Sequence, residues 1–158
     1  MKFTKDTIPE NSGLAAWHFA KLVSAMDGQI SKEEHIGLVN TMKVTVAISA
    51  VIAANKGEDP EEAQNSFMEN KTDLLKFWND PGPIDDAFID HALGLITDPV
   101  WANFAIAVAL FSASYDGLDD SESFLMDKAF ETWGCEEEEV TKYLGWLVKV
   151  ASGQDLDS

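Results

Sequence analysis

Apolar residues recur at helical spacing along most of this chain, and this period constrains the fold more than any other feature. An amphipathic helix places its apolar residues at positions i, i+3, i+4 and i+7. Three sets follow this spacing: Phe19, Leu22, Val23 and Met26; Met126, Ala129, Phe130 and Trp133; and Val140, Tyr143, Leu144 and Leu147. Residues 44–54 are rich in β-branched side chains, but they follow a helix start without a breaker and are interpreted as the buried end of a helix. The pattern therefore predicts an all-α fold.

Capping signals mark where these helices begin and end. Asp59-Pro60 and Asp98-Pro99 each place an N-cap residue before a proline in the first helical position. Gly134 stands where a left-handed residue commonly ends a helix. About seven helices are expected, over residues 13–26, 31–55, 59–78, 83–97, 99–116, 119–133 and 136–152.

The length of 158 residues favours one domain. We expect a single helical domain over residues 13–152, preceded by an N-terminal arm at 1–12 and followed by a frayed polar tail at 153–158. The helix predicted at 99–116 is apolar almost all round, which is typical of a central buried helix.

The charge of the chain restricts its partners. Its 28 acidic and 11 basic side chains give a net charge of −17, which disfavours nucleic acid and anionic membrane surfaces and favours cations and basic protein surfaces. The hydrophobic fraction of 46% separates the chain from the acidic disordered class. The chain is therefore expected to be a folded acidic protein that binds no nucleic acid.

Several features predict a soluble cytoplasmic protein. The single cysteine, Cys135, has no partner for an internal disulfide, and the first residues contain no apolar signal-peptide core. The longest nearly apolar run, at 101–113, is well short of the ~20 residues that span a bilayer. We expect no direct membrane insertion, and the oligomeric state stays open.

The most informative motif occurs twice, at residues 19–34 and 108–122. Each copy has an apolar helix that ends in Asp-Gly, then a short polar turn, then a cap residue three places before a glutamate. Glycine suits the left-handed backbone of such turns. The motif residues are Asp27, Gly28, Ser31 and Glu34 in the first copy, and Asp116, Gly117, Asp119 and Glu122 in the second, whose turn is one residue shorter.

This paired arrangement, with the Asp-Gly pairs about ninety residues apart, resembles the tellurite-resistance TerB family and the TerB-like domain of the co-chaperone DjlA. The resemblance implies a compact helical bundle in which the two Asp-Gly halves pack together. It also implies an acidic cluster, drawn from both turns, that binds a divalent cation. The implied role is a non-enzymatic one in stress response, with metal-binding or membrane-protein partners.

The acidic turns carry oxygen ligands of the kind that Ca²⁺ and Mg²⁺ prefer. Residues 27–34 match the second half of an EF-hand loop, but the acidic residues of the first half are missing in both copies. A cation site must therefore be assembled from the two turns together. The candidate ligands are Asp27, Glu34, Asp116, Asp119, Asp120 and Glu122.

A purely structural interpretation of the same residues stays open. Glu34 and Glu122 occupy capping-box positions, Asp119 an N-cap position, and Asp27 and Asp116 are common turn formers. On that interpretation the chain is an interaction domain of the co-chaperone type with no metal role. No catalytic residue and no organic cofactor are predicted, because no base appears together with a ligand set.

Other residues that attract attention have structural interpretations. The five tryptophans are expected to be core residues, and Trp78, beside the Pro-Gly turn, is expected to be the least buried of them. His18 is interpreted as a packing residue whose hydrogen bonds are satisfied. Cys135 is interpreted as an ordinary thiol.

Overall fold

Seven α-helices form the secondary structure of the computed structural model, which describes residues 8–26, 32–79, 84–113 and 120–154. None of these described residues lies in a strand, so the all-α prediction is confirmed. The helices are α1 (Gly13–Ser24), α2 (Lys32–Asn55), α3 (Pro60–Asn79), α4 (Asp86–Gly94), α5 (Pro99–Ala113), α6 (Asp120–Trp133) and α7 (Glu137–Ala151).

The predicted capping signals act as expected wherever the structure describes them. Helix α3 begins at Pro60, and the Asp59 carboxylate accepts a hydrogen bond of 2.9 Å from the Glu61 N–H. Helix α5 begins at Pro99, and Asp98 accepts one of 2.8 Å from the Val100 N–H. Gly134, just after α6, has a φ of 63°. Local chemistry therefore sets these boundaries.

Helix α4 is shorter than the predicted helix at 83–97. Asp85 caps it, with its side chain accepting from the Phe88 N–H at 2.9 Å, and the helix ends at Gly94. Leu95 and Ile96 leave the helix and are buried in the core. Residues 44–54 lie within α2, which confirms their interpretation as a helix end.

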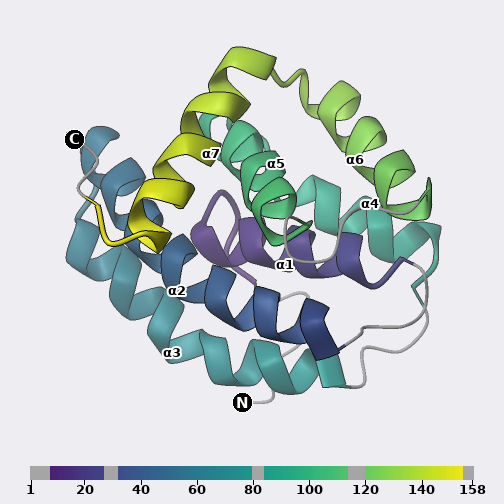
Figure 1. Cartoon of the computed structure of the whole chain (residues 1–158), viewed down its shortest axis with the longest axis horizontal. Coiled ribbons are helices and arrows are strands. Elements are labelled where there is room, and N and C mark those ends of the chain that lie inside the picture. The colour runs from purple at the N-terminus through teal and green to yellow at the C-terminus, as the bar shows by residue number, and fades with distance from the viewer. Residues whose placement is uncertain (1–7, 27–31, 80–83, 114–119, 155–158) are drawn as a thin grey trace.

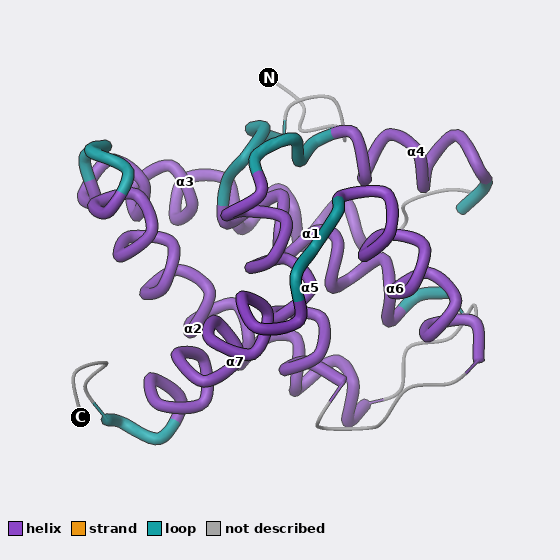
Figure 2. Tube along the Cα trace, turned by 90° about the horizontal axis from the view of Figure 1, so that it is seen from above, coloured by secondary structure: helices purple, strands orange, loops and turns teal. Residues whose placement is uncertain are grey.

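Helices α1 and α5 form the centre of the molecule (Figure 1). All twelve residues of α1 are buried, as are most residues of α5. The two helices pack against each other, while α2 and α3 pair on one side and α6 and α7 lie on the other (Figures 1 and 2). The expectation that the helix predicted at 99–116 is central is confirmed for its described part.

The aromatic residues are mostly core residues, with one correction. Trp17 and Trp101 are buried, and Trp133 and Trp146 are partly buried. Trp78 is only 7% exposed and is more buried than Trp133 and Trp146, so the prediction that it is the least buried tryptophan is wrong. Its Nε1 donates to Nδ1 of buried His18 at 3.1 Å, which joins α3 to α1 and gives the indole N–H a partner inside the protein.

Within the described residues, no helix combines the length and apolar content that crossing a bilayer requires.

Candidate functional site

The structure describes the predicted acidic site only in part. Asp27, Asp116 and Asp119 lie outside the described residues, and Glu34 lies in a stretch of α2 whose side chains are not described. Asp120 and Glu122 are both in the first turn of α6. Whether the six carboxylates converge therefore stays a prediction.

The two described carboxylates have different surroundings. Asp120 is exposed, whereas Glu122 is only 7% exposed. An ionised carboxylate is rarely buried without compensation by opposite charge or hydrogen bonds. Both also lie at a helix N-terminus, where the dipole favours negative charge. The position of Glu122 therefore suits a capping group and a cation ligand alike.

Lys21 is a charged residue of this region that the sequence pattern did not single out. Among the lysines, aspartates and glutamates whose side chains are described, only Lys21 and Glu122 are buried. Lys21 lies in the last turn of α1, where a cation interacts favourably with the helix dipole. In the sequence Lys21 stands among apolar residues such as Leu22 and Val23, and this is the signal that could have identified it as buried. A buried lysine thus lies in the last turn of α1, six residues before Asp27 in the sequence.

Helices α1 and α5 run in the same direction, because their starts are joined and they pack along their lengths. The Asn11 N–H donates to the Leu95 carbonyl at 2.9 Å. The Asn11 Oδ1 accepts from the N–H groups of Thr97 at 2.8 Å and Asp98 at 3.0 Å. With 12 and 15 residues, the helices are about 18 and 22 Å long. Their last residues therefore lie toward the same end of the molecule.

Each of these two helix ends precedes one Asp-Gly pair in the sequence. Among the described residues, no group of three or more His, Cys, Asp and Glu side chains is arranged to hold a metal ion. The described helices therefore define where the acidic turns start, and the ligand set itself remains a prediction.

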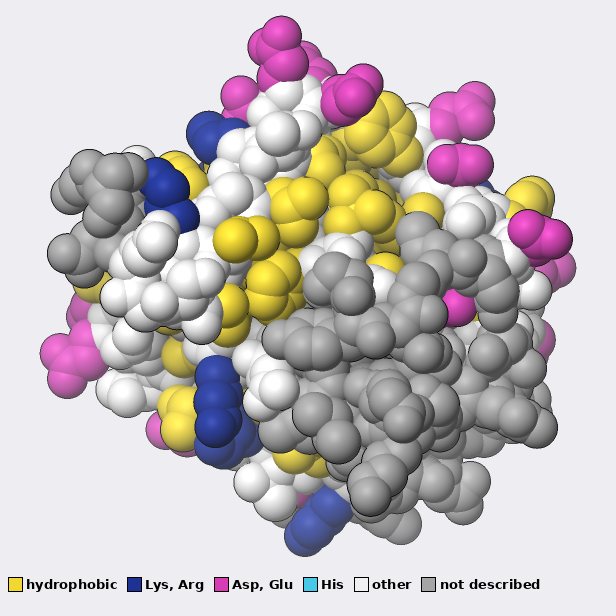
Figure 3. Space-filling view, viewed as in Figure 1, with side chains coloured by type: hydrophobic (Ala, Val, Ile, Leu, Met, Phe, Trp, Pro, Cys, Tyr) yellow, Lys and Arg dark blue, Asp and Glu magenta, His cyan; other side chains and the backbone are white. Residues whose placement is uncertain are grey.

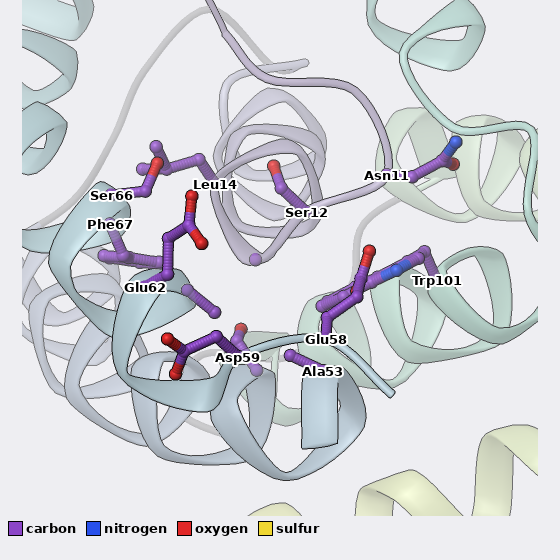
Figure 4. Close-up of a pocket in the computed structure, with 13 residues that line it drawn as sticks. Asn11, Ser12, Leu14, Ala53, Glu58, Asp59, Glu62, Ser66, Phe67 and Trp101 are labelled. Atoms are coloured by element: carbon purple, nitrogen blue, oxygen red, sulfur yellow. The ribbon is translucent and has the colours of Figure 1, made fainter. Parts of the chain in front are cut away.

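A separate pocket of about 370 Å³ lies at the opposite ends of these helices, where α1 and α3 begin (Figure 4). Its floor includes the apolar side chains of Leu14, Phe67 and Trp101, each of which is at most 3% exposed. Glu58 and Glu62 stand on opposite sides of its opening (Figure 4). The pocket thus combines an apolar floor with an acidic rim.

The wall of the pocket at α1 is closely packed. Ser12 caps the helix, with its Oγ accepting from the Ala15 N–H at 3.2 Å and donating to the Pro9 carbonyl at 2.7 Å. Gly13 follows, and a Cβ at this position would overlap Ser49 Oγ of α2 and lie 3.2 Å from Phe67 Cδ2 of α3. Only glycine allows the start of α1 to lie this close to both helices.

Asn11 holds the other edge of the pocket in an unusual backbone conformation. Its φ is 49°, and it is the only described non-glycine residue with positive φ. Asparagine adopts this left-handed region more readily than most residues. Besides the bonds that join it to residues 95–98, its Nδ2 donates to Thr97 Oγ1 at 3.0 Å. These bonds offset the backbone strain and give the edge a defined shape.

An ion pair lies beside the pocket and connects α2 to α5. The Lys56 ammonium donates to the Asp98 carboxylate. Partial burial alone would raise the pKa of Asp98, but hydrogen bonds from Lys56 and the Val100 N–H lower it below its usual value. The hydrogen bond to Asp98 in turn raises the pKa of Lys56. Lys56 therefore pairs with Asp98 and does not line the pocket.

Sequence patterns did not identify this pocket, because its lining comes from four separate segments. The local signals are the acidic run at residues 58–62 and the Ser12-Gly13 helix start. Neither signal indicates that the two segments face each other.

Cys135 is consistent with its interpretation as an ordinary thiol. It is partly buried, and this burial raises its pKa to about 11. The thiol is therefore protonated at neutral pH.

Comparison of the chain with protein families, with curated proteins and with solved structures finds no match. The resemblance to the TerB family accordingly stays a prediction from the two Asp-Gly motifs.

Proposed function

We propose that this protein is a non-enzymatic stress-response protein of the TerB type, which binds a divalent cation through an acidic cluster shared by its two Asp-Gly turns. The observation that carries the proposal is the parallel packing of α1 and α5. This packing supports a shared site, because the helix ends that precede the two turns lie at one end of the molecule. Ca²⁺ and Mg²⁺ are the expected cations, since carboxylate oxygens suit both.

Charge repulsion supplies the physical reason for such a site. Carboxylates brought close together favour either proton uptake or a bound cation. Asp120 and Glu122 begin α6 directly after the second turn, and Asp27 follows α1. Lys21 contributes one positive charge to this region, so the expected cation affinity is weak.

Titration with metal ions tests the proposal. Millimolar Ca²⁺ or Mg²⁺ is expected to raise the melting temperature and to shift the amide NMR signals of Asp27 and Asp116. The double variant Asp27→Asn/Asp116→Asn keeps the size of both side chains and removes two charges. It is expected to abolish both effects.

A matched control removes two charges elsewhere. Glu137 and Glu138 are exposed in the first turn of α7, so Glu137→Gln/Glu138→Gln is expected to leave the metal response unchanged. The cation proposal fails if Ca²⁺, Mg²⁺ and Mn²⁺ leave both the stability and the two amide signals of the unmodified protein unmoved.

Exposed apolar surface favours a second candidate function, that of a protein-interaction adaptor without a metal role. Phe124, in α6 just after the acidic residues, is 69% exposed. Hydrophobic side chains also gather over α5 between α6 and α7 (Figure 3). Exposed aromatic residues and apolar patches are typical of protein interfaces.

The adaptor function predicts binding that depends on Phe124 and is insensitive to chelators. Phe124→Glu is expected to abolish capture of a protein partner, while Met68→Glu, at a residue of α3 that is 49% exposed, is expected to preserve it. Capture that requires Ca²⁺ or Mg²⁺ would instead assign the interaction to the cation-bound protein.

A further inference from the structure

We propose that the pocket at the starts of α1 and α3 binds a small organic cation, in which an ammonium group is joined to an apolar body about the size of one aromatic ring. This site lies away from the Asp-Gly turns. Its test is therefore independent of the cation site proposed above.

The size and lining of the pocket fit a small molecule. Ligand pockets range from about 300 to 1,000 Å³, and this one is about 370 Å³. Leu14, Phe67 and Trp101 provide apolar contacts at its floor, with the methyl groups of Ala53 and Ala63 beside them. An apolar body that enters the pocket loses contact with water on several sides at once.

The charge at the rim selects a cation. Glu58, Asp59 and Glu62 carry three negative charges, and none of the described lining residues is lysine, arginine or histidine. The N-termini of α1 and α3 offset about half a charge each, which leaves a net charge of about −2 at the opening. Asp59 is partly engaged, because its Oδ1 accepts from the Glu61 N–H at 2.9 Å. Glu58 and Glu62 are therefore the expected partners of an ammonium group (Figure 4).

The structure favours an organic cation over a metal ion. A bound Ca²⁺ or Mg²⁺ takes about six or more oxygen ligands. Among the described residues, which include the carboxylates of this rim, no group of three or more His, Cys, Asp and Glu side chains is arranged to hold a metal ion. Two separated carboxylates above an apolar floor match a molecule that is charged at one end and apolar at the other.

The walls of the pocket are built from closely packed helix starts. Gly13 lies against Ser49 and Phe67, and hydrogen bonds on both its backbone and its side chain hold Asn11. A preformed site loses little conformational entropy when a ligand binds. The pocket is therefore expected to bind without rearrangement of α1, α2 or α3.

Three probes of similar shape test the charge requirement: phenethylamine, phenethyl alcohol and 3-phenylpropionate. Ligands of this size commonly bind with dissociation constants of order 1 mM, so each is titrated to about 10 mM against the full chain and followed by amide NMR. Phenethylamine is expected to shift the signals of Gly13, Leu14 and Phe67. The alcohol is expected to bind about tenfold more weakly, and the carboxylate not at all.

Charge-removing variants locate the site. Glu58→Gln/Glu62→Gln is expected to weaken the binding of phenethylamine about tenfold and to change the binding of the alcohol little. The control Glu61→Gln/Glu69→Gln removes two exposed charges of α3 that do not line the pocket, and it is expected to weaken binding of the amine less than twofold. Ala63→Leu fills the pocket and is expected to abolish binding of every probe.

Four results would overturn the proposal. These are equal binding of the amine and the alcohol, amine-induced shifts confined to residues outside the pocket, equal losses in the two charge variants, and no shift with any probe. A competition with millimolar Ca²⁺ is compared with a monovalent salt at the same ionic strength. If Ca²⁺ displaces more phenethylamine than that salt does, the rim binds a metal ion instead.

Discussion

Gly13 offers a sharp test of the packing described above. It is the first residue of α1, and a Cβ there would overlap Ser49 Oγ, lie 2.9 Å from Ser49 Cβ and lie 3.2 Å from Phe67 Cδ2. Gly13→Ala therefore sets two effects against each other. Alanine has the higher helix propensity, whereas the added methyl group overpacks the junction of α1, α2 and α3.

The magnitudes indicate that overpacking dominates. Replacing glycine by alanine inside a helix stabilises it by up to about 1 kcal/mol, and less at the first position. Overpacking a core costs about 1–3 kcal/mol. The Ser49 hydroxyl can rotate away only by losing its 2.6 Å hydrogen bond to the Thr45 carbonyl, worth about 1 kcal/mol, and Ser49 Cβ cannot rotate at all. We expect a net destabilisation of about 1–3 kcal/mol, or about 3–9 °C in melting temperature.

Urea denaturation of a double-mutant cycle measures this effect. The cycle uses Gly13→Ala, Ser49→Gly and the double variant, and a coupling energy of about 1–2 kcal/mol in favour of the double variant is expected. Gly145→Ala in α7 is the matched control, because nothing lies within 4 Å of a Cβ there. That variant is expected to be more stable by about 0.5–1 kcal/mol. Stabilisation of Gly13→Ala like that of Gly145→Ala, or a coupling energy of zero, would show that α1 does not pack closely against Ser49 at this position.

Three further predictions concern buried or paired polar groups. Trp78→Phe removes the hydrogen bond to His18 and part of the buried ring, so the free energy of unfolding should fall by about 2–4 kcal/mol in urea denaturation. A loss below about 1 kcal/mol would contradict the buried bond. Because folding lowers the pKa of Asp98, its ionised form stabilises the native state above about pH 4, and this contribution disappears as the pH falls through the folded-state pKa. Asp98→Asn should therefore be less stable than the unmodified protein at pH 6, by at most about 1 kcal/mol because the pair with Lys56 is partly exposed. The difference should shrink as the pH falls below about 4. Since burial raises the pKa of Cys135 to about 11, its alkylation rate should rise about tenfold per pH unit from pH 7 to 10, and a plateau below pH 9 would disprove this.

Much of the fold was predictable because its signals are local. Asp59-Pro60 and Asp98-Pro99 each satisfy backbone donors within two or three residues, so the sequence alone identifies where α3 and α5 begin. Gly134 likewise ends α6 through its own backbone conformation. The apolar period then separates helices from strands without any tertiary information.

The remaining features depend on contacts between distant segments. Trp78 is buried because α3 packs back against α1. There His18, 60 residues earlier in the sequence, accepts a hydrogen bond from the Trp78 indole N–H. The end of α4 depends on Leu95 and Ile96 turning into the core. The pocket depends on Gly13 meeting Ser49. No local pattern contains this information, because each position looks ordinary until its partner is known.

The candidate cation site was predicted from a repeated motif and is described only at its borders. The motif indicated that two acidic turns belong together, and the parallel course of α1 and α5 agrees with this. The buried charge of Lys21 was not predicted, because a lysine next to an acidic turn is usually exposed.

The central position of α1 has a consequence for how the chain folds. All residues of α1 are buried, yet its main neighbour α5 follows much later, and the bonds of Asn11 close a sequence separation of 86 residues. At synthesis rates of about 5–20 residues per second, α1 waits roughly 5–20 s for residues 99–113 to be made. Unlike helical bundles that assemble from neighbouring hairpins, this molecule needs a non-local pairing to complete its centre, which slows folding. During that interval the apolar residues of α1 lack the helix that covers them in the folded molecule, which leaves them open to misassociation.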